Sequence, residues 1–303
     1  MTEGRPVRVI YLGGLGRSGT TLLERLLGEV PAIVPLGEVV HLWRRGLIEG
    51  EPCGCGARLV ECPFWRKIGQ HAFGGWSTER AHRMLALRRA VDRTRRIPPR
   101  RSAALLEYVD AYRRVYTAAA EVADSDFVVD SSKHASLAFC LYAGGIDLHV
   151  LHVVRDPRAV AHSWRRHVSR PEDGRPMTRW SPARTCLHWA TQNLALELLA
   201  ARGARVTRVR YEDLLAAPRR TLAGLLLRFP VAAHLGFLTD RRAQLTTAHT
   251  ASGNPIRFAT GPIDLVPDDE WRTALPRSQR ALVTALTWPL MRRYGYRVRE
   301  AGR

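Results

Sequence analysis

The apolar positions of this chain fall into short runs that alternate with longer amphipathic stretches. Residues 7–12, 126–130 and 148–154 are mostly apolar and have the length of strands buried on both faces of a parallel sheet. Residues 205–210, RVTRVR, predict a further strand, and residues 32–34 a shorter one. This alternation predicts an α/β protein. At 303 residues, one such domain with insertions or two small domains are both possible.

Helical spacing is clearest in two long segments. Residues 76–123 carry apolar stripes on both sides of a break at 94–101, which contains two prolines and four arginines. We expect this helical segment, within an insertion at about 40–123, to shape a binding pocket or simply to pack. Residues 183–201 predict a long helix whose apolar positions are Leu187, Ala190, Leu194 and Leu198. The intervening residues 165–184, rich in arginine, predict a basic loop over the pocket.

The first apolar run leads into a glycine-rich turn and then into the helical stripe of Leu22, Leu23, Leu26 and Leu27. Converging backbone N–H groups and a helix N-terminus in this order form an anion-binding cradle. Compared with the phosphate-loop pattern G-x-x-x-x-G-K-[ST], Gly14, Gly19 and Thr21 agree, but Thr20 replaces the lysine. The positive charge that the lysine of this pattern supplies is carried instead by Arg17, within the loop. The cradle therefore predicts a phosphate-like ligand and argues against ordinary nucleoside triphosphate chemistry.

Two further strand ends carry cations. Lys133 follows the run 126–130, and it is one of only two lysines among 47 basic residues. Arg155 follows the run 148–154, Asp156 and Pro157 are suited to the start of a helix, and Ser163 lies about two turns further on. An alternative interpretation makes residues 126–130 a Mg²⁺-binding strand of a kinase, with Asp130 as the ligand.

Charge and composition narrow the possible partners. The net charge of +19 fits nucleic acid, a membrane surface or a polyanionic ligand. No basic run has interleaved aromatic residues and no nucleic-acid motif is present, so we expect no nucleic-acid partner. No signal peptide precedes residue 7, and the apolar runs are too short to span a bilayer, which predicts a cytoplasmic protein without stable membrane insertion. The oligomeric state stays open.

Three of the five cysteines, Cys53, Cys55 and Cys62, lie close together. They allow part of a zinc site, with His71 or His41 as the fourth ligand, or one disulfide. Because the spacing is not a standard zinc-finger pattern and the total is odd, we expect buried or oxidisable thiols and no metal.

The motifs together resemble those of sulfotransferases that use 3′-phosphoadenosine-5′-phosphosulfate (PAPS). G-x-G-R-S-G-T-T-L-L is similar to their 5′-phosphosulfate loop, and V-V-R-D-P-R-A-V-A-H-S to their 3′-phosphate motif. The Y-E-D-L stretch at 211–214 resembles a recurrent structural element of the family, which supports the fold and not a site. Residues 249–261, HTASGNPIRFATG, resemble a late loop that folds over the nucleotide and carries a cation, here Arg257.

The resemblance implies a single α/β domain over residues 1–303, with a central parallel sheet and a P-loop-like core. It implies transfer of a sulfuryl group from PAPS to a hydroxyl or amine of a small-molecule, glycan or natural-product acceptor, without a metal. The residues implied to bind the nucleotide are Gly16, Arg17, Ser18, Gly19, Thr20, Thr21, Arg155, Ser163 and Arg257. Arg17 is also implied to act in catalysis, and Lys133 to stabilise charge on the sulfate and the leaving phosphate. The alternative is a kinase-like phosphotransferase using ATP and Mg²⁺.

The reaction needs a base for the acceptor. The spacing of Glu38 after R-S-G-T-T resembles that of the glutamate base of tyrosylprotein sulfotransferases, so Glu38 is the first candidate. His41 and His134 are the rivals, because an unperturbed histidine titrates near neutral pH.

Overall fold

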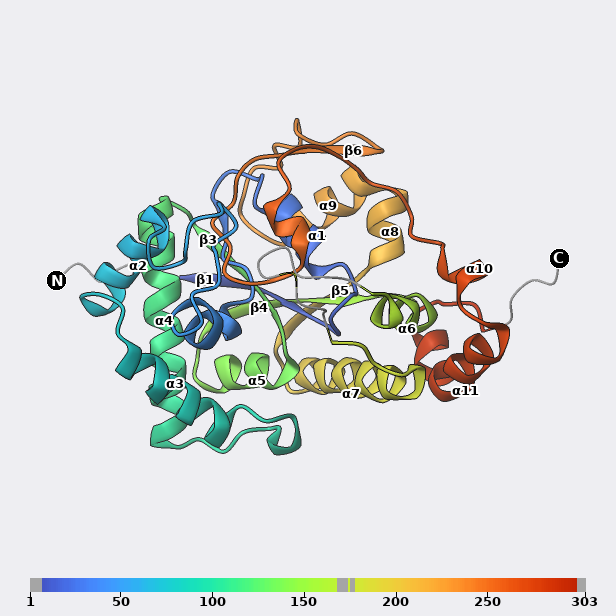
Figure 1. Ribbon diagram of the computed structural model, residues 1–303, viewed down its shortest axis with the longest axis horizontal. Helices are drawn as coiled ribbons and strands as arrows, with labels where there is room; N and C mark the ends of the chain where they lie inside the picture. The colour runs from blue at the N-terminus through green and yellow to red at the C-terminus, as the bar shows by residue number, and fades with distance from the viewer. Residues whose placement is uncertain (1–6, 168–173, 175–177, 299–303) are drawn as a thin grey trace.

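The computed structural model describes residues 7–167, 174 and 178–298, and Figure 1 shows how its elements surround a central sheet. The sheet is parallel and has five strands in the order β2-β3-β1-β4-β5. In that order the strands are Ile33–Pro35, Phe127–Lys133, Arg8–Gly13, Asp147–Val154 and Arg205–Arg210. The predicted α/β class, the parallel sheet and the P-loop-like arrangement of strand, glycine turn and helix are confirmed.

The two faces of the sheet bury separate clusters, because successive side chains of a strand point to opposite faces. Val9 and Tyr11 of β1 face one cluster, and Ile10 and Leu12 face the other. The first cluster lies under α4 (Ala103–Ala123), α5 (Ala135–Ala143) and α7 (Pro182–Ala201), and the second under α1 (Thr20–Leu27), α8 (Tyr211–Ala216) and α9 (Pro218–Leu226). The central strands are therefore apolar on both faces, as their sequences predict.

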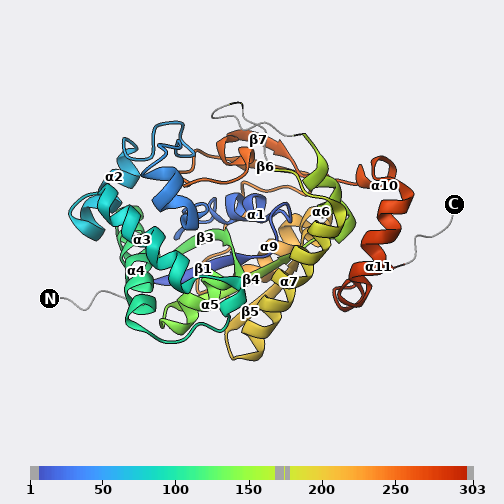
Figure 2. The same cartoon turned by 60° about the horizontal axis from the view of Figure 1, so that its bottom comes forward.

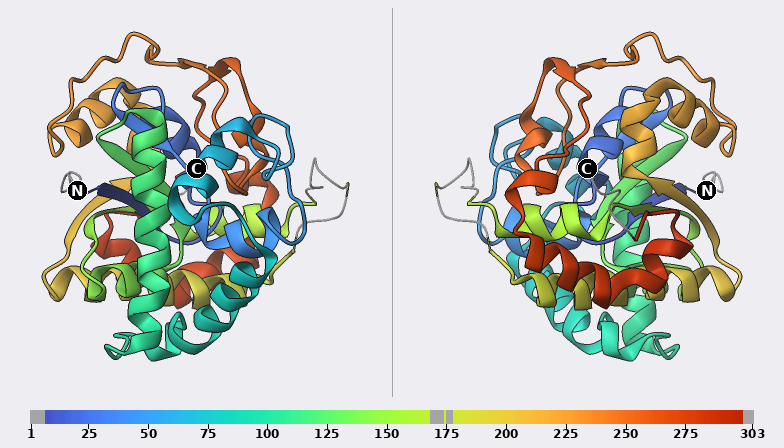
Figure 3. Two further views of the ribbon diagram at one scale, coloured as in Figure 1. Left: turned by 90° about the vertical axis from the view of Figure 1, so that its left-hand side faces the viewer. Right: turned by 90° about the vertical axis from the view of Figure 1, so that its right-hand side faces the viewer.

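The segment after β2 forms a helical subregion at one edge of the fold (Figure 2). Its elements are the short turns Val39–His41 and Leu42–Gly46, then α2 (Pro63–Phe73), α3 (Thr78–Val91), the turn Thr94–Arg96 and α4. Ser77 and Ser102 cap α3 and α4 with their hydroxyls. The predicted break between the two helices is confirmed at residues 92–102. Helix α4 stands upright and faces the viewer in the left view of Figure 3.

The remaining elements complete the opposite side. After β4 come α6 (Pro157–Arg165) and α7, and α11 (Arg277–Arg293) packs against both (Figure 3, right). A small antiparallel pair, β6 (Arg242–Leu245) and β7 (Gly261–Asp264), lies above α1 in Figure 1 and encloses the turn Pro255–Phe258. Helix α10 is short, Trp271–Ala274. Over the described ranges, no helix combines the length and apolarity needed to cross a bilayer.

Two sequence expectations need comment. The apolar stripe expected on α7 is mostly exposed, because Leu187, Leu194 and Leu198 are 66%, 53% and 40% accessible. The helix has a second apolar face, formed by Cys186, Trp189, Leu196 and Leu199, and packing against the sheet and α6 selected that face. Of the basic loop expected at 165–184, residues 168–173 and 175–177 lie outside the described part of the chain, including Arg170 and Arg175.

Candidate active site

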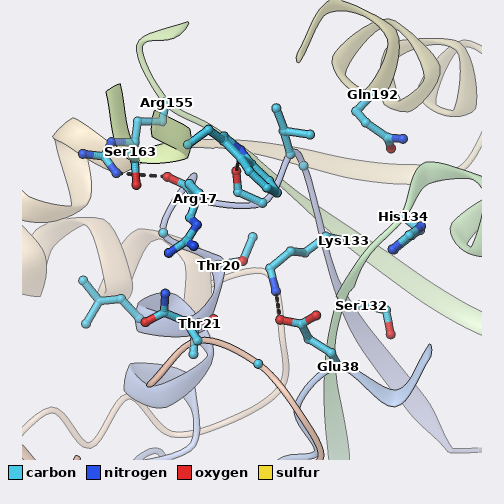
Figure 4. Close-up of a pocket in the computed structure, with 18 of the residues that line it drawn as sticks. Arg17, Thr20, Thr21, Glu38, Ser132, Lys133, His134, Arg155, Ser163 and Gln192 are labelled. Carbon is cyan, nitrogen blue, oxygen red and sulfur yellow. Dashed lines mark hydrogen bonds and ion pairs between the residues drawn. The ribbon is translucent and has the colours of Figure 1, made fainter. Parts of the chain in front are cut away.

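A cavity of about 630 Å³ opens at the carboxyl ends of the central strands. Strand β1 is followed by α1 on one face of the sheet, whereas β4 leads through α6 to α7 on the other. Such a reversal leaves a crevice between neighbouring strands, where ligands of open α/β sheets bind. Arg155 and Ser163 lie at one end of the cavity, His134 and Gln192 at the other, and Arg17, Thr20 and Lys133 between them (Figure 4).

The floor of the cavity is the glycine loop between β1 and α1. Gly14 and Gly19 have φ values of 147° and 91°, which L side chains rarely adopt. A Cβ on Gly14 would lie 2.4 Å from the Val153 carbonyl oxygen, and one on Gly19 would lie 2.2 Å from the Tyr211 ring. Helix α1 begins directly after this loop, and its first N–H groups have no partner within the helix. Glycine is required here so that the backbone can curl beneath a ligand.

Most of the loop residues expected to bind the nucleotide line the cavity, but one does not. Gly16, Arg17, Gly19, Thr20 and Thr21 line the cavity. Ser18 belongs to the same loop, but its side chain is buried and does not form part of the wall. Burial lowers the pKa of Arg17, which still remains far above neutrality for a guanidinium. The structure therefore brings a fixed positive charge and a helix N-terminus to one place.

Lys133 and Glu38 meet at the centre of the cavity wall. Lys133 Nζ donates to Glu38 Oε1, and His41 Nε2 lies 3.4 Å from Glu38 Oε2. Burial alone would raise the pKa of Glu38, but the Lys133 ammonium and the His41 ring outweigh it and hold that pKa well below its usual range. Glu38 is consequently a carboxylate at neutral pH, paired with the cation that flanks the phosphate loop.

The backbone of Lys133 is unusual for a residue at the end of a strand. Its φ is 71°, in the left-handed region that non-glycine residues seldom occupy. The pairing of β1 with β3 shifts register next to it, and its carbonyl accepts a hydrogen bond of 3.2 Å from the Gly14 N–H. Such strain persists where the surroundings impose it, and it is commonest at functional sites. The glycine loop and Lys133 are therefore built as one unit.

Arg155 forms the second cationic group of the cavity. Its Nη1 donates to the Arg17 carbonyl at 2.9 Å, its Nη2 donates to Asp268 Oδ2 at 2.8 Å, and its guanidinium lies 4.4 Å from the centre of the Tyr211 ring. Ser163, on α6, lines the same part of the wall. The cap of α6 is the predicted one, with Asp156 accepting from the Arg158 N–H. Two strand-end motifs separated by more than 130 residues thus become neighbours.

Several lining residues were not identified from the sequence. From the sequence, Tyr211 was expected only to support the fold, yet its ring packs against Gly19 and Arg155. Trp164 donates to the Gly16 carbonyl at 3.0 Å and stacks on Trp180, with 3.8 Å between ring centroids. The insertion contributes Arg45, Glu51 and Thr94. The only available signal for Trp164 was its position beside Ser163, since tryptophans occur widely in this chain.

Arg257 does not reach the cavity wall, contrary to expectation. Its side chain is fully buried, its Nη1 donates to the Pro52 and Thr250 carbonyls, and its Nη2 donates to Glu51 Oε1 at 3.2 Å. The neighbouring Gly253 and Asn254 do line the cavity. The guanidinium is drawn inward because burying a charge requires such partners. The late loop therefore borders the site, but its arginine holds the loop in place.

The structure also shows where the two histidine alternatives to Glu38 lie, and where the metal ligand of the kinase alternative lies. His41 and His134 line the cavity with their ring centroids 6.2 Å apart, and burial lowers the pKa of both, that of His134 to about 3. Asp130 does not line it. Tyr116 and Ser132 hydrogen-bond the two oxygens of Asp130, and burial raises its pKa to about 6. The proposed Mg²⁺ ligand of the kinase alternative is thus sequestered in the core.

Glu24, on α1, supports the loop that carries Glu38. Its carboxylate accepts from the Gly37 N–H at 2.6 Å and from the Ser131 hydroxyl at 2.7 Å, and burial raises its pKa from 4.5 to about 7. A raised carboxyl pKa means that the folded protein binds more protons than the unfolded chain between these values. Stability associated with the protonated form is therefore lost as the pH rises through about 7.

We expect Glu24→Gln to remove this pH dependence. Measured by urea unfolding, the free energy of unfolding of the variant relative to the wild type should increase by ~3 kcal/mol between pH 4 and pH 8. The glutamine retains an acceptor for Gly37, so the offset at low pH should be small. Parallel pH curves for the two proteins would show that Glu24 keeps an ordinary pKa.

The site defines the chain as an α/β protein with a P-loop-like glycine loop and a second cationic group at the same sheet edge. No family model and no curated protein sequence matches it. Two solved structures are similar in fold. Sulfotransferase STF9 from Mycobacterium avium has a TM-score of 0.46 and 14% identity over 74% of this chain and 64% of its own, less than two thirds of that length. Sulfotransferase STF1 from Mycobacterium tuberculosis has a TM-score of 0.45 and 19% identity over 78% of this chain and 70% of its own.

Proposed function

We propose that this chain transfers a sulfuryl group from PAPS to a hydroxyl or amine of an acceptor and releases 3′,5′-ADP. The observation that carries the proposal is the contact between Arg155 and the Arg17 carbonyl. It holds a second cationic side chain directly beside the glycine loop, within one cavity. A nucleotide with phosphates on both the 3′ and 5′ positions of one ribose requires this proximity, whereas ATP carries its phosphates on the 5′ position alone.

In the proposed complex the backbone of Gly16 to Thr21 binds the 5′-phosphate, as expected of a glycine loop at a helix N-terminus. Arg17, Thr20 and Thr21 contact the sulfate and the bridging oxygen. Arg155 and Ser163 bind the 3′-phosphate, and for this Arg155 exchanges its ion pair with Asp268 for the stronger charge of the ligand. We assign Arg257 to holding the late loop, through Glu51 and Pro52, so that Gly253 and Asn254 form the wall.

The proposed reaction is an in-line displacement at sulfur. The acceptor oxygen or nitrogen attacks the sulfur, the bond from sulfur to the bridging oxygen breaks, and the electron pair remains on the 5′-phosphate. Lys133 and Arg17 stabilise that developing charge. Glu38 takes the acceptor's proton. As Lys133 turns toward the donor it withdraws from Glu38, and the basicity of the carboxylate then rises because only His41 still opposes the effect of burial.

The acceptor occupies the end of the cavity bounded by the insertion in this proposal. Arg45 and Thr94 come from the insertion, and His134 and Gln192 line the same cavity. Polar groups of this kind suit a small molecule or glycan with several hydroxyls. Gln192 itself is held by the Ala135 N–H, which donates to its Oε1 at 3.0 Å.

Binding of 3′,5′-ADP is the direct test of the donor. We expect 3′,5′-ADP to raise the melting temperature in differential scanning fluorimetry, and ATP with Mg²⁺ to raise it much less. EDTA should not reduce the transfer of labelled sulfate from PAPS. A protein that binds ATP with Mg²⁺ and ignores 3′,5′-ADP would overturn the proposal.

Arg155→Ala should remove the protein's preference for a nucleotide that carries a 3′-phosphate. Since a hydrogen bond to a charged group contributes about 1.5–3 kcal/mol, we expect the preference for 3′,5′-ADP over AMP to fall about 10–100-fold by isothermal titration calorimetry. Affinity for AMP itself should change little. Arg205→Ala is the matched control, because Arg205 is exposed at the opposite end of the sheet and pairs with Asp147. An unchanged preference in Arg155→Ala would remove Arg155 from the donor site.

A further inference from the structure

Three cysteines and one histidine converge outside the cavity, behind the loop that carries Glu38. Cys53, Cys55 and Cys62 come from the segment after β2, and His249 comes from the late loop, almost 190 residues further along. The four ligand atoms all lie within 4.8 Å of one another. Cys62 Sγ is 3.2 Å and Cys53 Sγ is 3.8 Å from His249 Nδ1, and the sulfurs of Cys55 and Cys62 are 3.7 Å apart.

These separations match the edges of a coordination tetrahedron. With zinc–sulfur bonds near 2.3 Å and zinc–nitrogen bonds near 2.0–2.1 Å, tetrahedral geometry places two sulfurs about 3.8 Å apart and sulfur and nitrogen about 3.5 Å apart. A disulfide requires a much shorter sulfur–sulfur distance, about 2.05 Å. All three cysteines are free thiols in the structure. The four atoms are thus spaced for a shared ion and not for a covalent pair.

The backbone around the cluster is shaped to bring the sulfurs together. Gly54 donates to the Thr250 carbonyl at 2.9 Å, and a Cβ on Gly54 would lie 2.4 Å from the Ala248 carbonyl oxygen. Gly56 has φ 89° and donates to the Cys53 carbonyl at 2.8 Å. The Cys-Gly-Cys-Gly sequence therefore makes a tight turn pressed against the late loop, which no larger residue at position 54 permits.

The ligands are also oriented by their surroundings. Cys62 is the N-cap residue of α2. Phe64 stacks on the His249 ring with 5.3 Å between centroids, and Trp65 Nε1 donates to the His249 carbonyl at 3.0 Å. The N-terminus of a helix favours a thiolate, and contacts that fix ring orientation are typical of metal sites.

We propose that Cys53, Cys55, Cys62 and His249 bind one Zn²⁺ in a tetrahedral site with a structural role. Three sulfur ligands and one imidazole favour zinc over hard cations, and four protein ligands leave no open position for catalysis. The sequence predicted no metal, and the histidine is neither of the two candidates that its spacing allowed. His41 contacts Glu38, and His71 contacts Glu121 on α4.

The ion would join two segments that position the candidate base. Ala251, two residues after His249, donates to the Leu36 carbonyl and accepts from the Glu38 N–H, both at 2.7 Å. Ala251 also forms an isolated antiparallel β-bridge with Cys53. Zinc at this place holds the late loop against the segment 36–38. The inference does not depend on the proposed sulfotransferase activity.

The test is the metal content of the full chain, purified without chelators from zinc-supplemented culture. We expect about one zinc per chain by inductively coupled plasma mass spectrometry. Cys62→Ser and His249→Ala should lose the ion, whereas Cys140→Ser and Cys186→Ser, which change buried cysteines in α5 and α7, should keep it. Replacement by Co²⁺ should give the visible and charge-transfer bands of a tetrahedral thiolate complex.

If the variants fail to fold, two measurements on the wild-type chain still test the proposal. Removal of zinc by a chelator should lower the melting temperature, and added zinc should restore it. A wild-type protein that folds with no bound metal, or peptide mapping that finds a disulfide between Cys55 and Cys62, would overturn the zinc site. Zinc binding without any affinity for 3′,5′-ADP would leave this inference standing and remove the proposed function.

Discussion

Replacing Lys133 by alanine is expected to lower kcat for sulfuryl transfer by about 10²–10³-fold, the usual loss when one group that stabilises transition-state charge is removed. The dissociation constant for 3′,5′-ADP should change by less than about tenfold, because the charge that Lys133 serves develops in the transition state. The ammonium also holds down the pKa of Glu38. Burial raises that pKa once Lys133 is gone, so the acid limb of the pH–rate profile should move to higher pH.

The chain offers a matched control for this experiment. Lys67, the only other lysine, is exposed on α2 and should be replaceable by alanine without an effect on kcat. Lys133→Arg keeps the charge but spreads it over a larger planar group, and we expect an intermediate loss. A Lys133→Ala enzyme that loses nucleotide affinity and kcat in equal measure would show that Lys133 serves donor binding and not the transition state.

Glu38→Gln is expected to lower kcat/KM by about 10²–10⁴-fold, since a glutamine cannot accept the acceptor's proton. The loss should appear with little change in donor affinity, because the hydrogen-bonding partners of the Glu38 carboxylate are Lys133 and His41. Steady-state kinetics with labelled PAPS, together with calorimetry on 3′,5′-ADP, separate the two effects.

Glu51→Gln is the control for Glu38→Gln. Glu51 lines the same cavity with a side chain 15% accessible, against 14% for Glu38, but its carboxylate is held by Ser252 and Arg257. We expect a loss of less than about tenfold from that change. Activity within a few-fold of wild type in Glu38→Gln, with collapse in His41→Ala or His134→Ala, would transfer the role of base to a histidine.

The local pattern of apolar and polar residues was sufficient to predict much of the fold. Continuous apolar runs of five to seven residues predict strands buried on both faces, and all five predicted strands lie in the sheet. The glycine loop was equally readable, because Gly14 and Gly19 occupy backbone conformations that other residues avoid. The stripe on α7 was misplaced since that helix is apolar on two faces, and only its neighbours decide which one is buried.

The sequence by itself determined the parallel sheet, the glycine loop and the cations at the strand ends, since each depends on residues adjacent in the chain. Tertiary structure alone decided which of these groups meet. It paired Lys133 with Glu38, brought Arg155 to the Arg17 carbonyl, turned Arg257 inward to Glu51, and chose His249 over His41 and His71 to face the cysteines. The physical reason is that the packing of helices and loops on the sheet sets contacts between distant segments, and no local spacing encodes their distances.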